Sequence, residues 1–130
     1  MKAPPKINYR ETEGFNKDFK RLLKKFRTLR DDLKTAKRNA IDMYHLHNVD
    51  NLSVVPIPEF HSADIQVFKL KKFACKALKG RGVKSGIRVI YAYHSSSPTV
   101  DFIEIYFKGE KENEDRDRVR HYMKSPNDLS

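Results

Sequence analysis

Apolar residues recur at helical spacing near the start of the chain. Five of them follow the pattern i, i+4, i+7, i+8 and i+11, namely Phe15, Phe19, Leu22, Leu23 and Phe26. This spacing puts them on one face of a helix, and lysines and arginines fill the opposite face. Thr28 opens a second amphipathic segment, whose buried stripe runs from Leu29 to Tyr44. Two such helices with a short break between them predict an antiparallel helical hairpin.

Three later segments have the apolar, β-branched and aromatic content of strands. They are residues 65–74, 87–94 and 99–108, and a short fourth candidate, 7–10, precedes the first helix. Residues 46–64 contain two asparagines and two prolines, so we interpret them as an extended loop. Residues 110–124 are predicted to form a last, highly charged helix.

The predicted order is therefore β-α-α-β-β-β-α. Strands in hairpin succession after a pair of helices indicate the α+β class: a small antiparallel sheet with the helical hairpin packed on one face and a C-terminal helix. The length of 130 residues suits one domain. We place that domain at residues 1–124 and predict a flexible tail at 125–130.

Composition narrows the class of partner. The net charge is +10 and the pI is about 9.7, which favours nucleic acid, an acidic protein or an anionic membrane. No stretch approaches the roughly 20 apolar residues of a membrane span, and the N-terminus lacks an apolar signal core, so we expect a cytoplasmic protein. The single cysteine, Cys75, excludes an intramolecular disulfide and a cysteine-based metal site. The five histidines are scattered, and we expect neither a metal nor a cofactor.

The charge is concentrated on a strand pattern. Between Ile65 and Tyr91 the chain has no Asp or Glu but eight cations, which are Lys69, Lys71, Lys72, Lys76, Lys79, Arg81, Lys84 and Arg88. Residues two apart on a strand project from the same face, so Lys69 and Lys71 point the same way. With Arg88 added from the next strand, such a face would be strongly repulsive unless a polyanion neutralised it. This pattern favours a nucleic-acid ligand.

Cleavage of RNA without a metal requires a base, a cationic clamp and an acid. Arg88 suits the clamp, because its planar guanidinium matches phosphate oxygens in a bidentate way. A neighbouring positive charge lowers the pKa of a lysine, so one of Lys69 and Lys71 could act as base while the other binds phosphate. A glutamate among Glu110, Glu112 and Glu114 could be the base instead. Tyrosines on the strands could stack on bases; these are Tyr91, Tyr93 and Tyr106.

Structural explanations stay open beside these roles. Lysines on a strand edge often guard against aggregation, which would account for Lys69 and Lys71. Arg88 could pair with Asp101 or Glu104 on the following strand. Tyrosines on strands are often part of sheet packing.

The chain resembles the RelE/ParE superfamily, toxins of type II toxin–antitoxin systems, and within it the RelE-like branch. The resemblance spans roughly residues 7–123. It is carried by the order of elements together with four segments: Phe68-Lys69-Leu70-Lys71, Gly86-Ile87-Arg88-Val89-Ile90-Tyr91, Phe102-Ile103-Glu104-Ile105-Tyr106, and the closing run 108–115.

This resemblance implies a toxin that inhibits translation by metal-independent cleavage of mRNA in the ribosomal A site. It also implies a cognate acidic antitoxin that neutralises the toxin. ParE-like members share the fold but inhibit DNA gyrase, and fold alone does not separate the two activities. A basic binding module without activity is the third possibility.

Several single residues also match positions of the family's catalytic pattern. RelE-like toxins have two alternating lysines on the strand after the helices and an arginine on the next strand, which Lys69, Lys71 and Arg88 match. Lys111, or Lys108, stands for a basic residue after the following strand, and His121-Tyr122 is similar to a terminal pair of other branches. The family tyrosine at the start of the last helix has no match. The implied catalytic set is Lys69, Lys71, Arg88, Lys111 and His121, and the expected RNA-binding residues are Lys72, Lys79, Arg81, Lys84, Lys108 and Tyr91.

Overall fold

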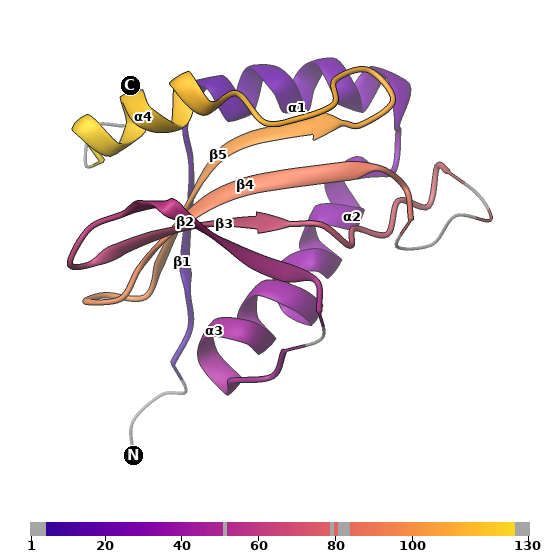
Figure 1. The fold of residues 1–130 in the computed structure, drawn as a ribbon. Coiled ribbons are helices and arrows are strands. Elements are labelled where there is room, and N and C mark those ends of the chain that lie inside the picture. Colours follow the sequence, from indigo (N-terminus) through magenta and orange to yellow (C-terminus); the bar gives the residue numbers. More distant parts are fainter. Residues whose placement is uncertain (1–4, 51, 79, 81–83, 127–130) are drawn as a thin grey trace.

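A five-stranded sheet in the order β1-β5-β4-β3-β2 forms the centre of the protein, in a computed structural model (Figure 1). The structure describes residues 5–50, 52–78, 80 and 84–126. The elements are β1 (Asn8–Glu11), α1 (Glu13–Lys25), α2 (Leu29–Ala36), a π-helical turn (Lys37–Asp42), α3 (Met43–His47), β2 (Val54–His61), β3 (Ile65–Leu70), β4 (Ile87–His94), β5 (Thr99–Phe107) and α4 (Arg116–Lys124).

The predicted α+β class is confirmed, with three corrections. Residues 46–64 are not one extended loop, because they include the end of α3 and the edge strand β2. The prolines of β2 are tolerated because an edge strand has one side without a hydrogen-bonding partner. The sheet is mixed rather than antiparallel, since β1 runs parallel to β5. The last helix begins at Arg116 rather than near 110, and the Asp115 side chain caps it by accepting from the Arg118 N–H.

One face of the sheet is covered by α1 and α2. The apolar stripe predicted for α1 is buried there, with Phe15 stacked on Phe102 of β5 at 5.0 Å between ring centroids. The Thr12 side chain accepts a hydrogen bond from the Phe15 N–H and so caps α1. These two helices therefore cover this face of the sheet and form the larger of the two apolar clusters with it.

The opposite face of the sheet packs against α4. Val119 and Tyr122 of this helix contact a second apolar cluster that includes Ile90 and Ala92. Side chains alternate along β4, so Arg88 lies on this second face. Figure 1 shows α4 and α1 at the β5 side of the sheet, where Arg118 donates to Asp18 at 2.6 Å.

The predicted tail of residues 125–130 falls mainly outside the described residues, since 127–130 are not among them. The domain limits stay a prediction.

Candidate nucleic-acid interface

A surface hollow of about 560 Å³ is lined by five cations at one end of the sheet. Its lining residues are Lys71, Lys72, Lys84, Arg88 and Lys108, together with Leu52, Val55 and Gly86. No carboxylate is among them. We call this site the basic hollow. Clustered cations without a counter-charge create a strongly positive local potential, which attracts a polyanion.

The sheet topology explains why cations so distant in the sequence meet here. Lys71 directly follows β3, Arg88 is the second residue of β4, and Lys108 directly follows β5. Because β3, β4 and β5 are antiparallel neighbours, these three positions lie at the same end of the sheet. Backbone hydrogen bonds fix the segments that carry two of these lysines. The Lys108 N–H donates to the Gly86 carbonyl at 2.8 Å, and the Lys71 N–H donates to the Ser53 carbonyl at 2.8 Å.

Gly86 is required at the entry to β4. Its φ is +86°, a conformation that disfavours residues with a side chain. A Cβ atom at this position would also lie 3.3 Å from the Phe107 ring. The backbone can therefore approach β5 closely enough to bring Lys108 to the hollow.

Arg88 forms no ion pair among the described residues. The two carboxylates considered as its structural partners are both occupied by other cations. Asp101 pairs with Arg10 at 2.6 Å, and Glu104 pairs with Lys111. The guanidinium of Arg88 is thus available for a phosphate group, and the structural explanation for this residue is wrong.

Unlike Arg88, Lys69 forms an ion pair with a carboxylate. Its Nζ lies 2.7 Å from Oε1 of Glu114, and its side chain is only 20% exposed. Burial alone would lower the pKa of Lys69, but hydrogen bonds to Glu114 and Tyr106 and the charge of Glu114 raise it above its usual value. These interactions favour the ammonium form of Lys69, whereas a general base needs the neutral amine, so the geometry disfavours Lys69 as the base of the lysine pair.

Lys111 and His121 do not line the basic hollow. Lys111 contacts Glu104, a buried carboxylate that also accepts the Asp115 N–H at 2.8 Å. His121 is exposed on α4, and its neighbour Tyr122 bonds to His94 at 2.9 Å, at the far end of β4 from the hollow. Neither residue therefore lines the hollow, although the Lys111 ammonium lies 5.8 Å from the ring of Tyr106, the cross-strand partner of Arg88.

Tyr91 cannot stack on RNA in this structure, because its side chain is 0% exposed. Its hydroxyl lies 2.8 Å from Nε2 of His45, and the His45 ring stacks on Tyr93 with centroids 4.0 Å apart. The prediction of an RNA contact for Tyr91 is wrong, and sheet packing is the correct interpretation. Burial lowers the pKa of His45 to about 4.

Of the other predicted RNA-binding residues, Lys72, Lys84 and Lys108 lie in the hollow. Lys79 and Arg81 fall outside the described residues. The apolar members, Leu52 and Val55, are not among the predicted site residues, because the asparagines and prolines around them indicate a loop rather than part of a site.

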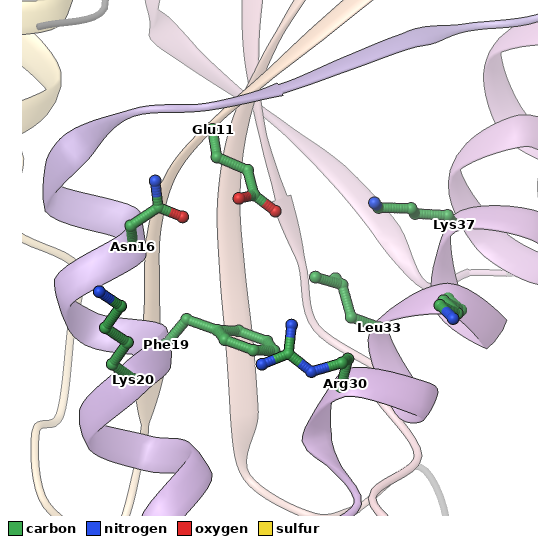
Figure 2. A pocket seen from close by; sticks show the side chains of 8 residues that line it. Glu11, Asn16, Phe19, Lys20, Arg30, Leu33 and Lys37 are labelled. Atoms are coloured by element: carbon green, nitrogen blue, oxygen red, sulfur yellow. The ribbon is translucent and has the colours of Figure 1, made fainter.

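A second hollow of about 400 Å³ lies between α1 and α2 (Figure 2). It holds the cations Lys20, Arg30, Lys34 and Lys37, with Glu11, Asn16, Phe19 and Leu33. Figure 2 shows the Glu11 carboxylate directed into this space. Because it contains its own carboxylate, this hollow is less suited to a polyanion than the basic hollow.

The described part of the chain has neither a membrane-spanning helix nor a cluster of metal ligands. None of its helices has the length and apolar character needed to cross a bilayer. In the same residues, no three potential metal ligands of the His, Cys, Asp or Glu type gather in one place.

The fold and the site define an α+β protein with a cationic, carboxylate-free hollow where three strands end. No protein-family model matches the chain, and no curated protein matches it. Among solved structures, the chain is similar to one chain of the crystal structure of the archaeal RelE–RelB complex from Pyrococcus horikoshii OT3. The two share 10% sequence identity with a TM-score of 0.46, over 79% of this chain and 96% of that chain.

Proposed function

We propose that this protein is the toxin of a toxin–antitoxin system and cleaves mRNA on the ribosome. The observation that carries the proposal is the basic hollow: five cations gathered from the ends of three strands, with no carboxylate among the lining residues. The RelE-like pattern of the sequence supports the choice of RNA as the polyanion.

Arg88 is assigned the role of phosphate clamp. In the cleavage step, the 2′-oxygen forms a bond to phosphorus and the bond from phosphorus to the 5′-oxygen breaks, leaving a 2′,3′-cyclic phosphate and a 5′-hydroxyl. Negative charge grows on the nonbridging oxygens, and a bidentate guanidinium stabilises it best. Lys71 pairs with no carboxylate among the described residues, so its ammonium can donate a proton to the leaving 5′-oxygen.

The proton of the 2′-hydroxyl needs an acceptor that the hollow does not offer. None of its lining residues is an aspartate, glutamate, histidine or tyrosine. In this proposal a basic group of the ribosomal complex accepts that proton. Free mRNA is accordingly expected to stay intact.

A cognate antitoxin with an acidic segment is the proposed partner. The net charge of +10 and the second set of cations between α1 and α2 support an acidic protein ligand. Such a partner would cover exposed cations in the resting state and release them when it is degraded.

The test is cleavage of a defined mRNA by the purified protein, with and without ribosomes paused on that mRNA. The proposal predicts cuts inside the reading frame only in the presence of ribosomes, with 5′-hydroxyl products. Arg88→Ala is expected to abolish the cuts, whereas Arg120→Ala, an exposed arginine paired with Asp117 on α4, is expected to retain them. Equal cleavage by Arg88→Ala and the unchanged protein would refute the assignment.

The missing proton acceptor favours a second candidate, a module that binds RNA through the basic hollow without cleaving it. This candidate predicts tight, salt-dependent binding to paused ribosomes or RNA and no new 5′ ends. The same assay separates the two functions.

A further inference from the structure

Leu52 presents an apolar side chain to solvent at the basic hollow. It is 69% exposed, and among the large apolar residues that the structure describes only Val49, at 43%, is also classed as exposed. Val49 does not line the hollow, whereas Leu52 and Val55 do. The hollow thus combines an apolar wall with its five cations.

The backbone holds Leu52 in a costly conformation. Its φ is +64°, in the left-handed region where the Cβ of a residue such as leucine is crowded by the following carbonyl. The Asp50 side chain fixes this turn by accepting the Leu52 N–H at 2.8 Å. Strained residues of this kind persist where the surrounding structure enforces them, and they cluster at ligand sites.

The pairing of cations with an apolar wall distinguishes between ligands. An inorganic phosphate or an acidic side chain would use only the cations. A nucleotide has both parts, because its phosphates carry charge and its base has an apolar face that side chains can contact once it is unstacked.

We propose that Leu52, with Val55, forms the contact surface for one unstacked base of single-stranded RNA whose phosphates lie on the cations of the hollow. The inference rests on the proposed function and makes the basic hollow a nucleotide site rather than a phosphate site. Leu52 is then a specificity-determining residue.

The experiment measures binding of two single-stranded RNAs of equal length and charge, one with bases and one with abasic riboses in the central positions, by fluorescence anisotropy. Contact of one base with a protein side chain is expected to favour the base-bearing RNA on the order of fivefold. Leu52→Asn is expected to remove most of this preference while affinity for the abasic RNA stays the same. Val49→Asn is the matched control and is expected to keep the preference.

Thermal unfolding separates a binding role from a structural role. Asparagine tolerates the left-handed conformation better than leucine, so Leu52→Asn is expected to leave Tm unchanged or raise it. Loss of the preference together with a lower Tm would overturn the proposal. So would a full preference in Leu52→Asn, or a Leu52→Asn variant that weakens binding only to a glutamate-rich peptide, which would place Leu52 in a protein interface.

Failure of this inference differs from failure of the proposed function. If Arg88→Ala lowers affinity for both RNAs but Leu52→Asn has no effect, the base contact is refuted and the phosphate site stands. If Arg88→Ala also has no effect on either RNA, both proposals fall.

Discussion

Lys69 and Arg88 project from the same face of the sheet into different electrostatic surroundings. Glu114 neutralises Lys69, while Arg88 has no carboxylate beside it among the described residues. The first residue therefore contributes to holding the segment before α4 against the sheet, and the second is available to a ligand.

Substituting each lysine of the pair by methionine should separate these roles. Lys69→Met leaves the buried Glu114 with Arg116 as its remaining ion-pair partner, so we expect the free energy of unfolding to fall by about 2 kcal/mol. Lys71→Met removes an ammonium without a paired carboxylate, so we expect little change in stability and weaker RNA binding. Urea denaturation and RNA binding measured on both variants test this, and equal stability losses would contradict it.

His45 makes stability depend on pH. Burial lowers its pKa in the folded state to about 4, whereas the unfolded chain has the ordinary value near 6.5. Between these values the unfolded state binds the proton and the folded state does not, so the free energy of unfolding falls as the pH falls from 6.5 to 4. After allowance for partial exposure, we expect a loss of about 2 kcal/mol from this residue.

The control for this pH effect is His45→Gln, which can still bond to the Tyr91 hydroxyl but does not titrate. The difference in stability between the unchanged protein and the variant should shrink as the pH is lowered from 7 to 4.5. A difference that stays constant over this range would show that His45 is not the titrating group.

At the scale of elements, a buried carboxylate joins α4 to three strands. Asp101 of β5 accepts from Arg10 of β1 at 2.6 Å, lies 2.9 Å from His94 of β4, and accepts from Tyr122 of α4. Burial would raise the pKa of Asp101, but these hydrogen bonds lower it below its usual value. Burial and the neighbouring Asp101 raise the pKa of Tyr122, so its hydroxyl stays protonated and donates.

Tyr122→Phe should loosen α4 without removing its apolar contacts. We expect the free energy of unfolding to fall by about 1–2 kcal/mol, because Asp101 loses one donor in a buried setting. Amide hydrogen exchange in α4 should become faster than in β4. Arg120→Ala, which breaks an exposed pair, is expected to change stability by less than about 0.5 kcal/mol.

The strands differ in how well the sequence predicts them. The segment 87–94 matches β4 because its apolar residues are β-branched and aromatic and lie between turn signals. The strand β2 was missed because Pro56 and Pro58 suggested a loop, and only its edge position makes them acceptable. The parallel pairing of β1 with β5 joins residues about 90 positions apart, and no local pattern signals such a contact.

The candidate site was predictable only in part, because it too depends on contacts between residues that are distant in the sequence. Alternation along the strands put Lys69 and Arg88 on one face, as observed. Lys69 is paired with Glu114, and Lys111 occupies Glu104, the carboxylate that could have paired with Arg88. Both Glu114 and Lys111 follow β5 in the sequence, so no local pattern places them beside these strands. The role of Leu52 can be inferred only from the structure, because it depends on a positive φ and on the position of the side chain beside the cations.

At the scale of the whole molecule, the net charge of +10 should make RNA binding strongly dependent on salt. If the cations of the basic hollow contact phosphates, Lys84→Ala should reduce the slope of log K against log salt by about 0.7. Lys17→Ala lowers the net charge equally but removes an exposed lysine of α1, paired with Glu13, and should leave the slope unchanged. Titrations at several salt concentrations measure both slopes, and equal changes would point to binding by overall charge alone.

The most direct test of the central claim is to express the protein inducibly in bacteria and map mRNA 5′ ends within minutes, with Arg88→Ala as the comparison. The account predicts new cuts inside translated frames, rapid growth arrest, and the loss of both in the variant while the variant remains folded. Growth arrest with intact mRNA, or cuts that persist in Arg88→Ala, would contradict it.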